Sequence, residues 1–145
     1  MKNKILQLTL CLFACMAISN TLTAQDAMPA KESIQKAKPV MTFTKKYIDI
    51  GTVKKGETRT TFFEFTNTGN AALEIDLISA CDCTTTDYPR GEILPGESGR
   101  IDTVFDSTEK DESEVIDVDI FLKQIDETTG GPIIEMLQYE FVLEK

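Results

Sequence analysis

Cys81 and Cys83, separated only by Asp82, are the residues of this sequence best suited to chemistry. Along an extended chain, side chains two residues apart share one face, and their α-carbons lie about 6.6 Å apart. Disulfides accept α-carbon separations of about 4.4–6.8 Å, so this pair can be joined only where the chain bends. In an oxidising compartment, two thiols so close together are expected to be oxidised.

Three uses of the cysteine pair follow from these residue types. The pair can be structural, as buried thiols or a static disulfide, or it can be a redox-active dithiol, or it can bind a metal. Zinc prefers four ligands, so two thiolates would need a carboxylate such as Asp82 or Asp87, or a second chain. Copper(I) accepts fewer ligands. We expect a structural role, with redox chemistry or a metal ion of unknown identity as the alternatives.

Residues suited to enzymatic catalysis are scarce in the rest of the sequence. The chain contains no histidine, which excludes histidine-based triads and most catalytic zinc sites. No potential nucleophile has a recognisable base nearby in the sequence. We therefore expect no catalytic residues, no cofactor and no enzymatic activity.

An acidic loop is the second cluster that could bind a ligand. It contains the carboxylates of Asp106, Glu109, Asp111, Glu112 and Glu114. Calcium prefers oxygen ligands, but this spacing matches no known calcium-binding loop, and the loop lacks a glycine for a tight turn. We expect a solvated, charged turn that discourages strand edges of neighbouring molecules from pairing.

The first residues have the three-part layout of a secretory signal peptide. Lys2 and Lys4 precede an uncharged apolar run from Ile5 to Ile18, which is shorter than the roughly 18 residues that span a membrane. We expect cleavage after Ala24, which leaves no transmembrane span in the mature chain. Alternatively, the sequence LFAC resembles a lipoprotein signal, in which a lipid on Cys15 would tether the protein to a membrane.

The charge of the chain limits its partners. Cleavage would remove Lys2 and Lys4 but no acidic residue, so the net charge of −9 would become −11. Such an acidic protein repels phosphate backbones, so we expect no nucleic-acid partner. The mature chain would be long enough for one small domain with a single hydrophobic core.

Residues 40–145 show the alternation of β-strands, whereas residues 25–39 are polar, bracketed by prolines and expected to form a flexible linker. Successive side chains of a strand point to opposite faces, so every second residue of a half-buried strand is apolar. The positions expected to share the buried faces are Phe63, Phe65, Leu73, Ile75, Leu77, Ile101, Thr103, Phe105, Ile116, Val118, Ile120, Leu122, Leu137, Tyr139, Phe141 and Leu143.

Turn signals separate these strands at hairpin-like spacing. Gly56, Gly69 and the pair Pro95–Gly96 lie between the alternating segments, and the last two residues suit a type II turn. About seven short strands with no convincing helix predict an all-β fold, an immunoglobulin-like antiparallel β-sandwich.

Four segments follow one another along the chain: DIGTVKKGE, FEFTNTGNAALEI, CDCTTTDYP and ILPGESGRIDTVFDST. Read in this order, they resemble the bacterial domain-of-unknown-function 1573 family, and the resemblance is strong from Tyr47 to Thr108. It implies an immunoglobulin-like sandwich, related to the domains of major sperm protein and ciliary scaffold proteins, that is exported to the bacterial envelope. Those relatives are binding or structural modules, and no established activity comes with the family.

We therefore expect an exported, non-catalytic module of the bacterial periplasm or cell envelope that binds an unidentified envelope protein. The expected mode is addition of a partner strand to an exposed sheet edge. The alternative is a thiol redox or metal-binding protein that uses Cys81 and Cys83.

Overall fold

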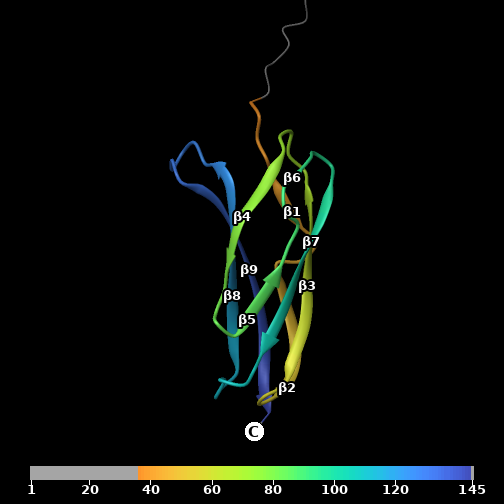
Figure 1. Cartoon of the computed structure of the whole chain (residues 1–145), viewed down its shortest axis with the longest axis vertical. Helices are drawn as coiled ribbons and strands as arrows, with labels where there is room; N and C mark the ends of the chain where they lie inside the picture. The colour runs from red at the N-terminus through yellow and green to blue at the C-terminus, as the bar shows by residue number, and fades with distance from the viewer. Residues whose placement is uncertain (1–35, 145) are drawn as a thin grey trace, which may run out of the picture. The chain divides into compact units, whose positions relative to one another are not determined.

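The computed structural model describes residues 36–144, and nine β-strands account for most of them (Figure 1). The strands are β1 (Met41–Phe43), β2 (Tyr47–Lys54), β3 (Thr58–Asn67), β4 (Leu73–Ser79), β5 (Thr84–Asp87), β6 (Glu92–Ile93), β7 (Ser98–Asp106), β8 (Glu114–Ile125) and β9 (Pro132–Glu144).

The strands form two sheets that face each other, which confirms the predicted β-sandwich. Sheet A has the strand order β1-β3-β7-β5, and sheet B has the order β2-β9-β8-β4-β6. In Figure 1, β3 and β7 lie in one layer, and β8 and β9 lie in the other. Buried side chains from both sheets form one hydrophobic cluster, so the two layers share a single core.

The alternation in the sequence places most of the core correctly. All the positions expected on the buried faces are buried except Leu77 and Leu143, and Leu143 is half-buried. Phe62, which alternates with the buried Phe63, is 46% exposed on the outer face of sheet A. Phe105, Tyr139 and Phe141 pack together in the core, with ring centroids 4.4 and 5.7 Å from that of Phe105.

Leu77 departs from the prediction because β4 contains a bulge. The pairing of β4 with β8 shifts register between Ile75 and Leu77, so the residues after the bulge change faces. Leu77 is 45% exposed, and Ile78 packs against the core in its place. The prediction that Leu77 shares the buried face of Leu73 and Ile75 is therefore wrong.

The first two strands of the domain belong to different sheets. β1 pairs with β3 in sheet A, and after three residues the chain crosses to sheet B, where β2 pairs with β9. The β2–β9 pair is parallel, whereas all other pairs are antiparallel. The sandwich is thus antiparallel as predicted, except where β2 runs alongside the last strand.

The N-terminal boundary of the domain lies before the predicted Val40. Lys36 to Pro39 belong to the same compact unit as the strands. The Lys38 amide donates to Asn70 Oδ1 at 2.6 Å, and the Asn70 amide donates to the Lys38 carbonyl at 3.0 Å. The last residues of the predicted linker are therefore held against the turn after β3.

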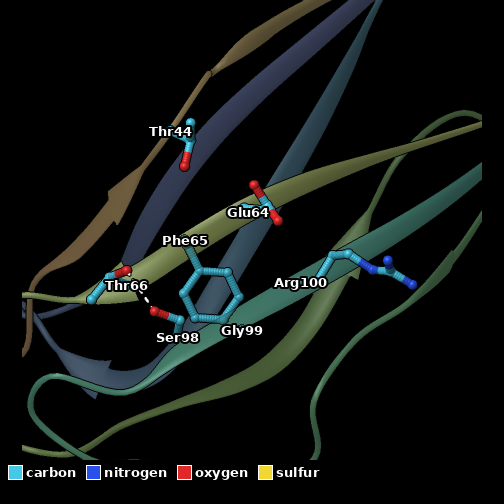
Figure 2. Close-up of a pocket in the computed structure, with 7 residues that line it drawn as sticks. All are labelled: Thr44, Glu64, Phe65, Thr66, Ser98, Gly99 and Arg100. Atoms are coloured by element: carbon cyan, nitrogen blue, oxygen red, sulfur yellow. Dashed lines mark hydrogen bonds between the residues drawn. The ribbon is translucent and has the colours of Figure 1, made fainter.

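A glycine in β7 makes room for an aromatic ring of β3. Gly99 lies directly opposite Phe65, and a Cβ atom at Gly99 would lie 2.5 Å from Phe65 Cζ. Figure 2 shows the Phe65 ring against this part of β7, with Thr66 and Ser98 hydrogen-bonded beside it at 2.8 Å. Any larger residue at this position would displace the buried ring.

Two turns share one arrangement, in which a glutamate closes the turn. Gly56 and Gly96 have φ values of 84° and 85°, which residues with a side chain rarely adopt. In the first turn the Lys54 amide donates to Glu57 Oε2 at 3.0 Å, and in the second the Leu94 amide donates to Glu97 Oε2 at 2.7 Å. Each glutamate amide also donates back to the carbonyl of the residue that begins the turn.

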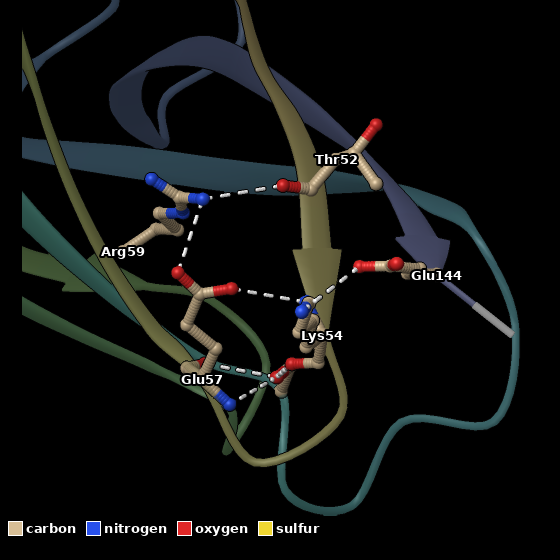
Figure 3. Close-up of polar contacts among 6 residues, drawn as sticks. Thr52, Lys54, Glu57, Arg59 and Glu144 are labelled. Carbon is tan, nitrogen blue, oxygen red and sulfur yellow. Dashed lines mark hydrogen bonds and ion pairs between the residues drawn. The ribbon is translucent and has the colours of Figure 1, made fainter.

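The first of these turns is also joined to the end of β7. The buried Ser107 hydroxyl lies 2.7 Å from the Lys54 carbonyl and 2.8 Å from the Glu57 carbonyl. Arg59 pairs with Glu57 at 3.0 Å and donates to the Thr52 carbonyl of β2 at 3.3 Å (Figure 3). These contacts tie the two sheets together at this end of the sandwich.

Candidate functional site

The structure joins Cys81 and Cys83 in a disulfide at the turn between β4 and β5. The Thr84 amide donates to the Cys81 carbonyl at 2.9 Å, which closes a turn across the pair. The turn brings the α-carbons to 5.1 Å, inside the range that disulfides accept. The bend that the sequence required for a disulfide is therefore present.

The disulfide lies at the boundary between the core and solvent. Both cysteines are half-buried and pack against the hydrophobic core, whereas Asp82 between them is exposed. The Cys83 carbonyl accepts a hydrogen bond from the Asp106 amide at 2.9 Å, so the turn is held by β7. The sulfur atoms thus have a fixed position beside a solvent-exposed loop.

Thr84 brings a hydroxyl to both sulfur atoms. Its Oγ1 lies 3.2 Å from Cys81 Sγ and 3.6 Å from Cys83 Sγ. The same oxygen is hydrogen-bonded to the hydroxyl of Tyr139, which extends from β9 in the opposite sheet. A line of polar groups therefore runs from the disulfide through Thr84 to the core.

Burial raises the pKa of the Tyr139 hydroxyl, and the hydrogen bond with Thr84 partly opposes this. The phenol therefore keeps its proton at neutral pH. Either of the two hydroxyls can donate in this hydrogen bond. When Tyr139 donates to Thr84 Oγ1, the Thr84 proton is free to point at Cys81 Sγ.

This disulfide stabilises the folded state only slightly. In the chain-entropy model a loop of three residues gives about 1.6 kcal/mol, against about 4.7 kcal/mol for a loop of 100 residues. Cys81 and Cys83 are only two positions apart, so their bond restricts the unfolded chain very little. The sandwich derives its stability from the shared core.

No third metal ligand joins the cysteines in the part of the chain that the structure describes. No group of three or more Cys, Asp or Glu side chains within residues 36–144 lies close enough to hold a metal ion. The metal hypothesis for Cys81 and Cys83 therefore gains no support from Asp82 or Asp87.

The acidic loop forms local polar contacts. Asp106 Oδ1 accepts hydrogen bonds from the amide and hydroxyl of Thr108, and these bonds lower the pKa of the Asp106 carboxyl. Asp111 pairs with Lys55 at 2.7 Å, and Lys110 pairs with Glu114 at 2.6 Å. These contacts are those of a solvated turn.

The second candidate site is the outer edge of β3 at Thr58–Phe63, called the β3 edge below. β1 pairs with β3 only opposite Phe65, Thr66 and Asn67, and the chain then leaves for sheet B. Within residues 36–144, no other strand pairs with the β3 edge. The main-chain groups there are free to pair with an added strand.

A groove lies alongside the β3 edge. It has a volume of about 270 Å³ and is lined by Thr44, Lys45, Ile48, Thr61, Phe62, Phe63 and Glu64. The groove therefore combines apolar side chains of both sheets with the main chain of β3.

A more open depression lies next to this groove on the outer face of sheet A. Its volume is about 570 Å³, and its lining is largely polar, with Thr44, Glu64, Thr66, Ser98 and Arg100 around the main chain of Gly99 (Figure 2). Arg100 is paired with Asp102 at 3.0 Å, and its guanidinium carbon lies 5.1 Å from the Phe62 ring centroid. This surface holds no group of residues suited to catalysis.

Comparison with known families identifies the fold family of this chain. The family model described as "Protein of unknown function (DUF1573)" matches residues 41–130. The chain belongs to the DUF1573 family. The match confirms the resemblance seen in the sequence and extends it beyond Thr108, to the turn before β9. None of the curated proteins matches the chain.

Solved structures with a similar fold come from bacteria and from humans. A protein of unknown function from Porphyromonas gingivalis W83 has 23% identity and a TM-score of 0.61 over 77% of this chain and 50% of that protein. This DUF1573 chain thus spans about half the length of the Porphyromonas protein. The ASH/PapD-like domain 7 of human CEP192 has 12% identity and a TM-score of 0.57, over 72% of this chain and 85% of that domain. At these identities the similarity shows a shared PapD-like, immunoglobulin-like fold.

A third similar structure belongs to an enzyme. The Vibrio cholerae VesB protease has 13% identity and a TM-score of 0.54, over 72% of this chain but only 31% of the protease. This match also concerns the fold alone.

Most of the motif residues that carry the family resemblance hold the fold together. Glu57 and Glu97 close turns, Ser107 joins one of these turns to β7, and Asn67 connects several segments. The cysteine segment is the exception, because its disulfide adds little to the fold. The sequence did not predict that Thr84 and Tyr139 belong to this site. The tyrosine lies 55 residues away from Thr84, and only its position on the buried face of β9 could have indicated it.

The predicted signal peptide at 1–24, most of the predicted linker and Cys15 lie outside the described residues. Export, cleavage and lipidation therefore stay predictions. No helix among residues 36–144 is long and apolar enough to span a membrane.

Proposed function

We propose that this protein is an exported, non-catalytic module of the bacterial cell envelope that binds another protein by strand addition at the β3 edge. The observation that carries the proposal is the short β1, which pairs with three residues of the ten-residue β3 and leaves Thr58–Phe63 without a partner strand within the described residues. Strand addition obtains affinity from main-chain hydrogen bonds and specificity from pockets for alternate side chains.

The hydrogen-bond pattern of β3 identifies which main-chain groups a partner would meet. In an antiparallel pair, alternate residues direct their N–H and C=O groups to opposite sides of the strand. Asn67 bonds towards the β7 side, through Glu97 and Gly96, whereas the Glu64 carbonyl accepts from Thr44 on the β1 side. The same alternation turns the main-chain groups of Thr60 and Phe62 towards the open edge.

The side chains around the β3 edge also suit a partner strand. Phe62 is exposed on the outer face, and Ile48 and Phe63 line the groove on the inner side. An extended segment with alternating apolar residues would contact both surfaces. Its affinity would come from desolvation of these apolar groups as well as from the main chain.

The other exposed edges are less suitable for strand addition. β5 has only four residues, and β2 is irregular between Asp49 and Thr52. On the outer side of β4, the Tyr88 hydroxyl donates a hydrogen bond to the Asp76 carbonyl at 3.3 Å. Short strands and bulges are the usual means of protecting an edge, whereas β3 pairs with β7 in continuous register.

Thr60→Pro tests the proposal, with Thr60→Val as its matched control. Proline at this position removes an N–H group that faces the open edge, so the ladder with β7 stays complete. We expect the wild type and Thr60→Val to capture the same partner from envelope extract, and Thr60→Pro to lose it. With the captured partner, amide hydrogen exchange at Thr60 and Phe62 should slow on binding.

Equal capture by Thr60→Pro and Thr60→Val would show that the partner binds elsewhere. The absence of any specific partner, together with unchanged envelope properties after deletion of the gene, would refute the binding role itself.

The intact mass of protein recovered from its host tests the proposed export. A mass equal to that of a chain beginning at Gln25 supports cleavage after Ala24. A mass equal to that of a chain beginning at a lipid-modified Cys15 supports the tethered alternative. A full-length mass would contradict export by either route.

A further inference from the structure

We propose that the Cys81–Cys83 disulfide is a thiol-exchange site, in which a protein dithiol attacks Cys83 Sγ and Thr84 stabilises the departing Cys81 thiolate. This inference is independent of strand addition at the β3 edge. The partner is defined by its chemistry, as an exported protein that carries two neighbouring thiols.

The position of Thr84 distinguishes the two sulfur atoms. Its hydroxyl oxygen is closer to Cys81 Sγ, at 3.2 Å, than to Cys83 Sγ, at 3.6 Å. A hydrogen bond to a thiolate favours the charged form, so the sulfur nearer to Thr84 is the better leaving group. The other sulfur, that of Cys83, is then the one attacked.

Tyr139 sets the direction of the Thr84 hydrogen bond. The tyrosine hydroxyl is buried between the sheets and is bonded to Thr84 Oγ1. We assign the phenol as the donor of this bond, and the Thr84 proton is then directed towards Cys81 Sγ. Tyr139 is thus a positioning residue that acts through Thr84.

The location of the pair also suits repeated opening and closing. The cysteines are only half-buried, and Asp82 between them is exposed, so the turn that carries the disulfide lies at the surface. The bond closes a loop of minimal length, so its loss relaxes the unfolded chain very little. The turn is also closed by the hydrogen bond from the Thr84 amide to the Cys81 carbonyl at 2.9 Å, which involves neither sulfur atom.

The exchange balances over two steps. A thiolate of the partner attacks Cys83 Sγ, a mixed disulfide forms, and the Cys81–Cys83 bond breaks to release the Cys81 thiolate. The second thiol of the partner, as its thiolate, then attacks the mixed disulfide and releases the Cys83 thiolate. The partner is oxidised to a disulfide and gives up its two thiol protons. Cys81 and Cys83 are reduced by two electrons; Cys83 takes up one proton, and Cys81 stays a thiolate that accepts the Thr84 hydrogen bond.

Thr84→Val tests the role of the hydroxyl, and Thr85→Val is its matched control on the same strand. The proteins are equilibrated with mixtures of reduced and oxidised glutathione, the free thiols are alkylated, and the reduced fraction is counted by mass. We expect wild type and Thr85→Val to be reduced alike. The equilibrium constant for reduction of Thr84→Val should be lower by about tenfold or more, since a hydrogen bond to a charged group is lost.

Single-cysteine variants test which sulfur leaves. Cys83→Ser keeps only the Cys81 thiol, and Cys81→Ser keeps only the Cys83 thiol. We expect the pKa of the Cys81 thiol, measured from the pH dependence of alkylation, to be the lower of the two. Adding Thr84→Val should abolish this difference.

Two further variants test whether the effects come from an unpaired hydroxyl or from loss of the folded state. The double variant Thr84→Val, Tyr139→Phe removes both hydroxyls, so no buried hydroxyl is left without a hydrogen-bond partner. Its equilibrium constant for reduction should equal that of Thr84→Val. The double variant Cys81→Ser, Cys83→Ser should fold and should unfold no more than about 10 °C below the wild type, because loss of a disulfide that closes so short a loop costs little stability.

The proposal is overturned if the disulfide of the folded wild type stays closed in an excess of reduced glutathione and of dithiothreitol. It is also overturned if the Cys81→Ser, Cys83→Ser variant fails to fold, because the bond is then structural. Equal reduction of Thr84→Val and Thr85→Val would remove Thr84 from the mechanism.

Discussion

At the scale of single residues, Asn67 holds the turn region of the sandwich together. Its side-chain amide donates to the carbonyls of Ala71 and Ile93, both at 2.9 Å, and its Oδ1 accepts from the Gly69 amide at 3.0 Å. The side chain is fully buried, so each of these groups would otherwise lack a partner. The asparagine of the family motif is therefore explained by the fold.

Asn67→Asp should destabilise the protein strongly. The carboxylate has the same shape, but it cannot donate to the two carbonyls, and its charge would be buried. We expect the free energy of unfolding to fall by about 3 kcal/mol or more. Urea denaturation measures the change, with the exposed Asn70→Asp as control. Equal stability of both variants would contradict the role of Asn67.

Thr103→Val should have the opposite effect. Thr103 Oγ1 is buried in the core and has no hydrogen-bond partner within the described residues. Valine has the same shape and no hydroxyl to desolvate, so stability should rise by about 1 kcal/mol. The exposed Thr85→Val is the control in the same denaturation assay. A loss of stability in Thr103→Val would reveal a partner for the hydroxyl.

At the scale of elements, β4 shows how one irregularity changes the face of several residues. Side chains alternate along the strand up to Ile75, and the bulge then places Leu77 outside and Ile78 inside. The alternating sequence ALEIDLI gives no sign of this change, because Leu77 continues the apolar pattern. Only the pairing with β8 determines where the extra residue lies.

Serine substitutions at Ile75 and Leu77 test the bulge. Ile75 is 3% exposed, so Ile75→Ser should lower the free energy of unfolding by about 3 kcal/mol. Leu77→Ser should change it by no more than about 0.5 kcal/mol, because the leucine is already exposed to solvent. Chemical denaturation of both variants gives the comparison. Similar losses in both would indicate that β4 has no bulge.

The arrangement of β1 and β2 also determines where a partner can bind. The short β1 and the crossing to β2 leave the β3 edge open, and nothing in the local sequence indicates this. VMTF and YIDIG read as two ordinary strands. Their assignment to different sheets depends on residues far along the chain, since β1 pairs with β3 and β2 pairs with β9.

At the scale of the whole molecule, carboxylates held by hydrogen bonds or ion pairs link stability to pH. Hydrogen bonds from the amides of Thr129 and Thr128 lower the pKa of Asp126. Hydrogen bonds from Thr108 lower the pKa of Asp106, and the contact with Lys55 lowers that of Asp111. A carboxyl whose pKa is lower in the folded state stabilises the fold above its unfolded pKa. That contribution is lost as the pH falls through the folded pKa.

Stability should therefore be nearly constant near neutral pH and fall below about pH 4. Asp126→Asn keeps an acceptor for the loop amides but removes the titrating carboxyl, so its stability should decline less steeply in acid. Thermal unfolding between neutral pH and acid measures the slopes, with Asp76→Asn as control. Identical acid slopes for wild type and Asp126→Asn would contradict a contribution from this loop.

The sequence by itself determined the two-layer β fold, most of the core and the family, because the alternation of side chains along a strand is a local property of the backbone. It also identified the cysteine pair and the bend that a disulfide needs. Only the tertiary structure decided the strand order, the parallel β2–β9 pair, the exposure of Leu77 and the open β3 edge. It alone placed Tyr139 beside Thr84 and the disulfide. The physical reason is that pairing and packing between distant strands depend on the whole core, which no short segment specifies.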